Sequence, residues 1–390
     1  MTDVMFLYAD HHATTPMAPE VLDAMAPWMA FSANASSVHS FGRAARKAIE
    51  EARAEVAQAI GASPEEIVFT SGGTEADNLA VRGGALAARA TDPRRTRVAV
   101  TKTEHAAVRE AARSLVPWGF CLEELPVDAD GLPRPEEANA ALGAETALLS
   151  AILANNETGV VNDGLPALAR MARSAGVLSH TDAVQAVGKI PVDVTALGVD
   201  LLSLTGHKFG GPKGAGALFV RKGVRLSPQQ WGGGQEKGRR AGTENVAALV
   251  GLGEAARVTT QRLEAETARI SALRDRFEAG LLAAIPGLRV NGGRPGVRRL
   301  PTATSAVFPG VEAETLLVAL DLEGIAASSG SACAAGTTKP STVLLATGLS
   351  PDEVRSTLRF SFGRTTRDEE IDRLLDVVPR LHRHAQARAT

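Results

Sequence analysis

The sequence has few cysteines, few aromatic residues and no excess of either charge. Only 2 of its 390 residues are cysteines, which excludes the disulfide framework of a small secreted domain and favours a reducing compartment. Its 42 basic and 44 acidic residues leave a net charge of −2, which excludes a strongly basic surface for nucleic acid or anionic lipid. No apolar run approaches the ~20 residues of a membrane span, and the N-terminus lacks a signal-peptide pattern. We therefore predict a cytoplasmic protein without direct membrane or nucleic-acid binding.

The chain has the length and the pattern of an α/β protein. With 44% hydrophobic residues it can bury large cores, and its length allows two or three domains. Short apolar runs alternate with amphipathic helical stretches over roughly the first 250 residues, which predicts βαβ units and a mostly parallel sheet. The expected strands lie at 65–70, 97–102, 147–153, 176–183, 199–205 and 215–220, and clear helices at 42–61 and 165–176.

The composition changes near residue 260. The sequence predicts one long helix from Asn245 to Ala284, and Pro286 and Gly287 mark its end. Beyond it, β-like segments are mixed with helices. We predict a large domain over 15–259 and a smaller α+β domain built from 1–14 and 260–390, with a loop at about 327–340.

The two cysteines lie in different surroundings. Cys121 belongs to the alternating stretch GFCLEELPV, which predicts a strand and a small buried hydrophobic residue. Cys333 lies in SSGSACAAG, where small residues without apolar periodicity predict an exposed loop. A reactive thiolate needs access, so Cys333 is the candidate nucleophile.

Glycines and a threonine follow the first expected strand. The stretch SGGTEADN at 71–78 places Gly73 and Thr74 at a strand-to-helix turn, where backbone N–H groups can surround a phosphate. A tight turn capped by Ser71 or Thr74 explains the same residues equally well. Neither G-x-x-x-x-G-K-[ST] nor a G-x-G-x-x-G that opens a helix after a first strand is present, so ATP and NAD are not favoured.

Other strand ends carry polar residues as well, and one carries a lysine. Lys208 follows the apolar run LLSL among glycines, in SLTGHKFGGPKG. His105, Asp182 and the segment NNETG (155–159) follow other strands, and ligands bind at this edge of parallel sheets. A desolvated amine is nucleophilic, a carboxylate can keep a pyridine nitrogen protonated, and a histidine can stack on a ring. Together these residues suggest pyridoxal 5′-phosphate.

The ordered motifs carry a family resemblance over nearly the whole chain. They are DHHATTP, SGGTEADN, TEHAAV, NNETGVV, TDAVQAVGK, TGHKFGGPKG, GGGQEKGRRAGTENV, SSGSAC and STLRFSFGR. In this order they resemble the motifs of the cysteine desulfurases. These enzymes belong to the class-V aminotransferase group of fold-type-I pyridoxal phosphate enzymes. The resemblance implies a large domain with a mostly parallel sheet flanked by helices, a smaller α+β C-terminal domain, and conversion of L-cysteine to L-alanine.

The resemblance also implies catalytic roles. Lys208 matches the Schiff-base lysine that moves the α-proton, and His105 matches the ring-stacking histidine. Asp182 matches the partner of the pyridine nitrogen. Cys333 matches the loop cysteine that takes the sulfur as a persulfide, and its loop resembles in length that of the long-loop group.

Binding residues follow from the same motifs. Thr243 matches a residue that reaches the phosphate of the neighbouring subunit, which implies a homodimer. Arg359 matches the clamp on the substrate carboxylate, for which a planar guanidinium is suited. Asn34 and Asn156 are expected to line the substrate site. The full set of expected cofactor ligands is Gly73, Thr74, His105, Asn156, Asp182, Gln185, Thr205, His207, Lys208 and Thr243.

Some alternatives stay open at this point. A selenocysteine lyase or another lyase or aminotransferase of the same fold would share most motifs, and a Cys333→Ala variant separates these from a desulfurase. A non-catalytic binding protein would be expected to lack the lysine or the cysteine. We expect no metal site, because adjacent His11 and His12 point apart on an extended chain beside Asp10. The protein that accepts the sulfur is not indicated by the sequence; iron–sulfur assembly, tRNA thiolation and DNA phosphorothioation all use similar enzymes.

Overall fold

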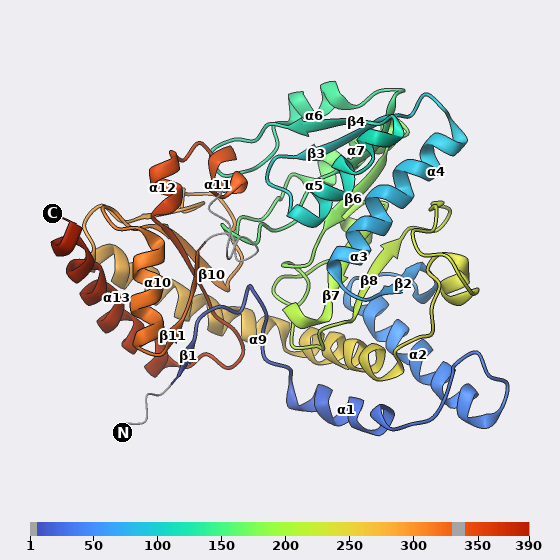
Figure 1. Cartoon of the computed structure of the whole chain (residues 1–390), viewed down its shortest axis with the longest axis horizontal. Coiled ribbons are helices and arrows are strands. Elements are labelled where there is room, and N and C mark those ends of the chain that lie inside the picture. The colour runs from blue at the N-terminus through green and yellow to red at the C-terminus, as the bar shows by residue number, and fades with distance from the viewer. Residues whose placement is uncertain (1–5, 330–339, 390) are drawn as a thin grey trace.

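Two hydrophobic cores share one long helix, α9 (Val246–Ala284), which passes from one lobe to the other (Figure 1). The structure is a computed structural model that describes residues 6–329 and 340–389. The first half of α9, up to Ala256, packs into the core around the large sheet, and Ile270 onward packs into the second core. The change of core lies between these two residues; the domain boundary expected at 259 stays a prediction.

The large lobe contains a seven-stranded sheet in the order β2-β8-β7-β6-β5-β3-β4. Only β8 runs antiparallel to its neighbours; the remaining pairs are parallel. Most strands are buried on both faces, as expected where helices cover both sides of a sheet. The α/β prediction is thus confirmed. The strands are β2 (Ile67–Thr70), β3 (Arg97–Thr101), β4 (Cys121–Leu125), β5 (Thr146–Ser150), β6 (Leu178–Asp182), β7 (Leu201–Thr205) and β8 (Gly216–Val220).

Helices flank this sheet. The Ala-rich α2 (Ser40–Ala59) buries an apolar stripe against α9, and its N-terminus is capped by the His39 side chain. Gly61, at φ +67°, lets the chain turn away after the helix. The other helices of this lobe are α1 (Pro19–Met29), α3 (Gly73–Asn78), α4 (Gly84–Thr91), α5 (Ala106–Arg113), α6 (Pro135–Ala141), α7 (Leu165–Ser174) and α8 (Val194–Leu197).

The smaller lobe pairs the start of the chain with its C-terminal part. The strand β1 (Leu7–Tyr8), which the sequence pattern did not suggest, runs parallel to β11 (Ile325–Ala326). An antiparallel sheet in the order β12-β13-β10-β9 packs on an aromatic cluster, in which the rings of Phe277 and Phe360 lie 5.1 Å apart. Its strands are β9 (Arg289–Val290), β10 (Ala303–Val307), β12 (Ser328–Ser329) and β13 (Thr357–Ser361), and its helices are α10 (Ala313–Leu322), α11 (Thr342–Ala346), α12 (Pro351–Arg355) and α13 (Asp368–Ala389).

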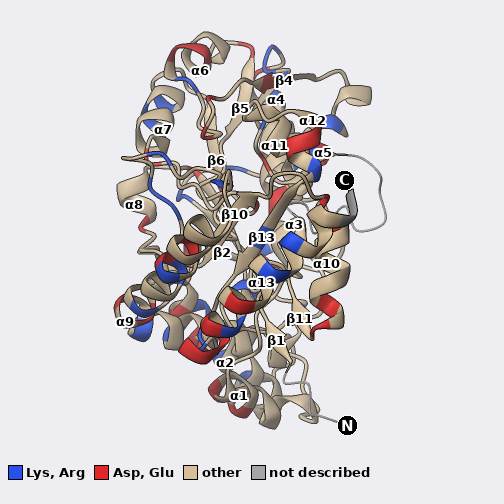
Figure 2. Cartoon of the chain, turned by 90° about the vertical axis from the view of Figure 1, so that its left-hand side faces the viewer, with Lys and Arg blue, Asp and Glu red and all other residues tan. Residues whose placement is uncertain are grey.

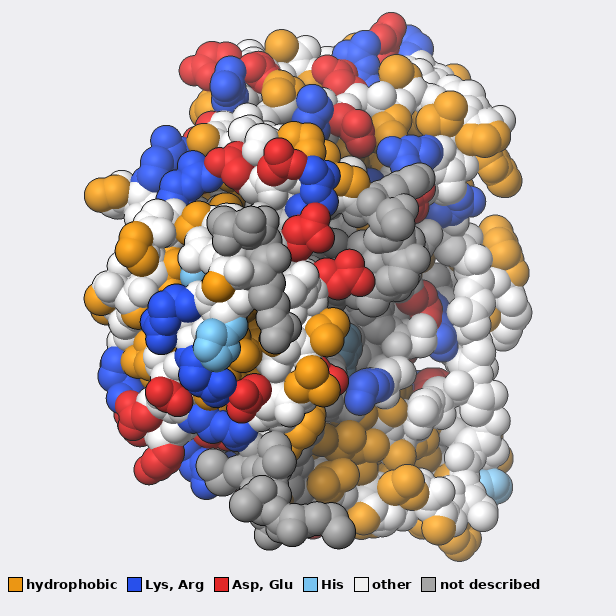
Figure 3. Space-filling view, turned by 60° about the vertical axis from the view of Figure 1, so that its left-hand side comes forward, with side chains coloured by type: hydrophobic (Ala, Val, Ile, Leu, Met, Phe, Trp, Pro, Cys, Tyr) orange, Lys and Arg blue, Asp and Glu red, His pale blue; other side chains and the backbone are white. Residues whose placement is uncertain are grey.

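The surface carries charges of both signs. Residues of both signs lie on α13 (Figure 2), with Asp and Glu mostly in its first half and Arg mostly in its second. Both signs are interspersed over the face in Figure 3 without one extended patch of either sign. Within residues 6–329 and 340–389, no helix is long and apolar enough to cross a membrane.

The prediction that Cys121 is buried was wrong. Cys121 does lie in a strand, but it is the first residue of β4, which forms an edge of the sheet. Its side chain is exposed, whereas Leu125 at the other end of the same strand is buried.

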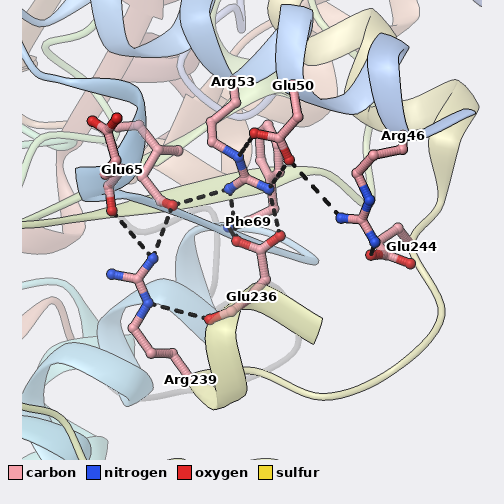
Figure 4. Close-up of polar contacts among 9 residues, drawn as sticks. Arg46, Glu50, Arg53, Glu65, Phe69, Glu236, Arg239 and Glu244 are labelled. Carbon is pink, nitrogen blue, oxygen red and sulfur yellow. Dashed lines mark hydrogen bonds and ion pairs between the residues drawn. The ribbon is translucent and has the colours of Figure 1, made fainter. Parts of the chain in front are cut away.

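A buried ion pair holds the segment between β8 and α9. The Arg53 guanidinium donates two hydrogen bonds to the Glu236 carboxylate, at 2.7 and 2.8 Å, and the Phe69 backbone N–H donates to the same group at 3.0 Å (Figure 4). Glu236 and Lys237 adopt the left-handed conformation, with φ +47° and +58°, which is unfavourable for residues other than glycine. The bidentate pair therefore fixes a strained turn in the segment that also contains Thr243.

We expect Glu236→Ala to lower the free energy of unfolding by about 3 kcal/mol, because the buried Arg53 guanidinium then keeps only the half-exposed Glu50 as a charged partner. The side chains of Arg53 and Glu236 are only 9% and 3% exposed, so water cannot replace the lost carboxylate. Urea unfolding followed by circular dichroism measures the change. As a control, Glu51→Ala breaks the exposed pair with Lys47 and should leave the midpoint unchanged. Equal effects of the two variants would contradict the expectation.

Candidate active site

A cavity of about 560 Å³ lies where the carboxyl ends of the central strands meet residues of the smaller lobe. Its volume is typical of a site for a small ligand or cofactor. The predicted site residues that line it are Gly73, Thr74, His105, Asn156, Asp182, Gln185, Thr205, His207, Lys208 and Arg359. Asn34 and Thr243 are exposed and are not among the described lining residues. Cys333 lies outside the described residues.

Lys208 enters the cavity from a short turn after β7. Its Nζ donates to the carbonyl oxygens of His12 at 2.5 Å and Ala13 at 2.9 Å. The turn is compact: a Cβ on Gly206 would lie 3.2 Å from the Pro212 carbonyl oxygen. Glycine therefore favours this close approach of two backbone segments, and the turn directs the amine into the cavity.

Asp182 and His105 lie together at one end of the cavity. Asp182 is the last residue of β6, and its Oδ1 accepts a hydrogen bond from the Val184 backbone N–H at 2.8 Å. His105 caps α5, and its Nδ1 accepts from the Ala107 N–H at 3.2 Å. One ring nitrogen of His105 and one carboxyl oxygen each of Asp182 and Asp77 lie within 4.8 Å of one another. Burial raises the pKa of Asp182, and the charges of His105 and Lys208 oppose this effect.

Other lining residues offer groups suited to an anion. Gly73 starts α3 on the cavity wall, and a Cβ there would lie 2.8 Å from the Val184 side chain. Thr74 and Thr205 add hydroxyl groups. Burial lowers the pKa of His207 to about 4, with further contributions from Lys208 and Lys213, so its imidazole is neutral at pH 7. Neutral donors and a helix start together can hold a phosphate group.

Arg359 is buried in β13 and already has partners. Its guanidinium donates to the Asn156 carbonyl oxygen and to Asp10 Oδ1, both at 2.8 Å. The imidazole of His12 contacts the same carbonyl through Nδ1 at 3.2 Å and Thr302 Oγ1 through Nε2 at 2.8 Å. If a substrate carboxylate binds to Arg359, the guanidinium therefore contacts both that carboxylate and the Asp10 carboxylate.

Of the two segments that flank 330–339, one pairs with the strand of Arg359 and the other lines the cavity. Ser328, in β12, pairs in register with Arg359. On the other side, Ser341 and Thr342 line the cavity, and Ser341 Oγ donates to Glu157 Oε2 at 2.5 Å. The described residues just before 330 thus lie beside Arg359, and those just after 339 line the cavity.

Several lining residues were missed by the sequence reasoning, namely His12, Asp77, Glu104, Arg109, Glu157 and Ser341. Asp77 and Glu157 lie inside the quoted motifs SGGTEADN and NNETG, and Glu104 directly precedes His105. Acidic residues beside the expected site residues were the available signal, but their spacing alone does not distinguish a cavity wall from a solvated surface.

Glu157 is expected to make stability depend on pH. Burial raises its pKa from the usual 4.5 to about 7. Between these values the folded protein binds more protons than the unfolded chain, so the free energy of unfolding falls as pH rises. Glu157→Gln cannot ionise and still accepts from Ser341. Between about pH 4 and pH 8 the variant should gain on the order of 3 kcal/mol relative to the wild type. Urea unfolding at both pH values measures this, and parallel pH dependences would contradict it.

Known proteins are similar to this chain in sequence and in fold. Residues 7–374 match the family model described as Aminotransferase class-V. A cysteine desulfurase IscS from Dictyoglomus turgidum is 43% identical over 376 residues, which cover 96% of this chain and 94% of that protein. A NifS-like protein of known structure superimposes with a TM-score of 0.89 at 32% identity and covers 97% of this chain and 100% of its own. A structure of SspA in complex with cysteine is 34% identical, with a TM-score of 0.80 over 92% of this chain and 99% of its own.

Proposed function

The chain belongs to the cysteine desulfurases of the class-V aminotransferase family, and from this premise we propose that it converts L-cysteine to L-alanine and transfers the sulfur to Cys333. The observation that carries the proposal is the convergence of Lys208, Asp182, His105 and Arg359 on one cavity. These residues come from four distant motifs, and an amine, a buried carboxylate, an imidazole and a guanidinium are the groups that this chemistry needs.

The cofactor we propose is pyridoxal 5′-phosphate, and the cavity has groups that fit it. Its aldehyde needs an amine, which Lys208 supplies, and its ring nitrogen needs a carboxylate, which Asp182 supplies. The neutral donors around Thr74 and His207 suit its phosphate. Asn156 Oδ1 is buried without a hydrogen-bond partner among the described residues, which suits a polar ligand group nearby. When bound, such a cofactor supplies an electron sink for the carbon next to the substrate amine.

The residues of the chain then have separate tasks. Arg359 binds the substrate carboxylate, and Lys208 moves the proton at the α-carbon. The Cys333 thiolate attacks the substrate sulfur; the C–S bond breaks as the S–S bond forms, and alanine takes the hydrogen that completes its methyl group. The products are L-alanine and a Cys333 persulfide, so no outside oxidant is needed. An acceptor protein then takes the sulfur.

We also propose that the protein acts as a homodimer in which Thr243 contacts the cofactor of the neighbouring subunit. Thr243 is exposed in the segment that the Arg53–Glu236 pair holds. Exposed aromatic and aliphatic side chains gather at α1 and the start of α2, where Phe31 contacts Phe41. Apolar side chains left in solvent are expected at an interface between subunits.

The test is alanine production from L-cysteine by the purified protein supplied with pyridoxal 5′-phosphate. We expect alanine and sulfide in equal amounts when a thiol reductant is present. No alanine from cysteine would overturn the proposal. Alanine from selenocysteine alone would favour the selenocysteine lyase instead, and amino transfer to an oxo acid without sulfur release would indicate an aminotransferase.

A further inference from the structure

A second cavity, of about 90 Å³, lies between the two lobes and adjoins the active-site cavity. Its apolar lining includes Ala255 from the core of the large lobe, and Ile270 and Phe362 from the core of the smaller lobe. Lys208 lines both cavities, so the two are neighbours. The second cavity has room for about three water molecules or one small ion, and the proposed function gives it no role.

Basic side chains outnumber acidic ones in the lining of the second cavity. Among the described residues, the lining contains Lys189, Lys208, Arg262 and Arg364, but only one acidic residue, Glu266. Glu266 is paired with Arg269 at 2.9 Å, and Arg262 is paired with Glu20 at 2.8 Å. Lys189 and Arg364 form no ion pair within the part of the chain that the structure describes. The second cavity therefore has an excess of positive charge.

Lys189 is the buried cation of this lining. Its side chain belongs to a residue that is only 7% exposed, and its Nζ donates to Gln185 Oε1. An ammonium group has three hydrogens, so two remain for another acceptor. Burial lowers the pKa of Lys189, and the charges of Lys208 and Arg359 add to this effect. An anion in the second cavity would oppose both effects and keep the ammonium group charged.

His11 offers a hydrogen-bonding group that the folded chain does not use. His11 lines the second cavity, is 2% exposed, and has an Nε2 atom without a hydrogen-bond partner among the described residues. Its Nδ1 lies 2.7 Å from Thr15 Oγ1. Burial lowers the pKa of His11 to about 4, with further contributions from Lys189 and Arg364, so the imidazole is neutral at pH 7. When the Thr15 hydroxyl donates to Nδ1, the hydrogen of the neutral ring lies on Nε2 and can bind an anion.

The imidazole of His11 is fixed by its packing. A Cβ on Gly363 would overlap this ring, so the backbone of Gly363 lies directly against it. The Tyr8 ring contacts it edge-on, with the ring centroids 5.1 Å apart. Because Gly363 precedes Arg364 in the sequence, this contact also brings the backbone of Arg364 close to His11. A donor that is already fixed loses little conformational freedom when a ligand binds, which favours binding.

We propose that the second cavity binds one small oxyanion, held by the Lys189 ammonium group, the Nε2–H of His11 and the Arg364 guanidinium. Phosphate, sulfate and short carboxylates share the chemistry that these donors recognise, because each presents several negatively charged acceptor oxygens. The volume excludes a nucleotide. Lys189 follows β6 of the large lobe and Arg364 follows β13 of the smaller lobe, so the bound anion would contact both lobes. The site does not depend on the proposed function.

Isothermal titration calorimetry of the cofactor-loaded protein tests this site. Loading with pyridoxal 5′-phosphate first occupies the phosphate-binding residues of the active site. The protein is then titrated with inorganic phosphate in one experiment and with acetate in another, both at constant ionic strength set by chloride. We expect one bound anion per chain. Binding of phosphate alone identifies an inorganic oxyanion, and binding of acetate alone identifies a short carboxylate. Binding of neither anion would overturn the proposal.

Two arginine variants locate the bound anion. Arg364→Gln should weaken binding by at least about 10-fold, because it removes a charged hydrogen-bond donor. Arg364 is only half-buried, so we expect this variant to fold. Arg367→Gln is the matched control, because Arg367 is 61% exposed, lies three positions farther along and does not line the cavity. Equal affinities of the two variants would overturn the proposal.

A third variant tests the imidazole. His11→Phe retains an aromatic ring against Gly363 but removes Nε2, and it should also weaken binding by at least about 10-fold. Circular dichroism checks that the variant is folded. An affinity equal to that of the wild type would overturn the role of His11.

Failure of this site and failure of the proposed function can be distinguished. A protein that never binds pyridoxal 5′-phosphate would contradict the proposed function. The two arginine variants are then compared without cofactor, where any phosphate in the active site affects both equally, because neither Arg364 nor Arg367 lines that cavity. Weaker binding in Arg364→Gln than in Arg367→Gln would still support the oxyanion site, and equal binding would overturn it.

Discussion

Replacing Lys208 with alanine is expected to lower the rate of alanine formation from cysteine by at least about 10³-fold, since both proton transfer and the covalent hold on the cofactor are lost. Among the residues that the structure describes, no other lysine lines the active-site cavity. Lys189 is buried nearby, but its Nζ donates to Gln185 Oε1. We expect borohydride reduction followed by peptide mass spectrometry to find the cofactor on the Lys208 peptide of the wild type and on no peptide of the variant.

The control for this prediction comes from the same loop. Lys213 is exposed five positions farther along the glycine-rich segment. Lys213→Ala has the same change of charge and side-chain size, and it should retain both the covalent cofactor and the rate. Cofactor that stays covalently bound in Lys208→Ala would show that the anchoring amine lies elsewhere.

Replacing Cys333 with serine is expected to lower the rate of sulfur release by at least about 10²-fold, because a hydroxyl is a poor acceptor of sulfur. The cofactor should still bind and give an unchanged absorption spectrum, because Lys208 and Asp182 are intact. Spectroscopy and sulfide assays on one preparation separate these two effects. Cys121→Ser is the natural control, since Cys121 is an exposed thiol at an edge of the large sheet. A wild-type rate in Cys333→Ser would exclude this thiol as the acceptor.

The sequence predicted the large sheet well, for physical reasons. Buried parallel strands such as β7 are continuous apolar runs, so they are visible without knowledge of their partners. The ends of the strands were predicted less accurately. The strand expected from residue 65 starts at Ile67, because Pro64–Glu66 form a short 3₁₀ helix. The two-residue strand β1 gave no periodic signal at all.

The sequence analysis found the site residues that directly follow strands. It missed residues whose contacts depend on the register between strands. Lys208 and Asp182 could be found because parallel strands place their carboxyl ends along one edge. The contact of Ser150 with His180 could not be found, because it depends on the register between β5 and β6. In the sequence, such residues look like isolated polar positions in apolar strands.

Thr243 is exposed in the single chain, and its expected contact with the neighbouring subunit stays a prediction. Asn34, which is expected to line the substrate site, is exposed as well. A crosslink between Thr243→Cys of one subunit and Thr74→Cys of the other would support the predicted approach.

The most direct measurement is a reaction of the cofactor-loaded protein with L-cysteine in the absence of reductant and acceptor, followed by alanine analysis and peptide mass spectrometry. The account predicts about one equivalent of alanine per subunit, after which the reaction stops, with one additional sulfur atom on the Cys333 peptide. Sulfur found only on Cys121 or on no cysteine, or no alanine at all, would contradict it.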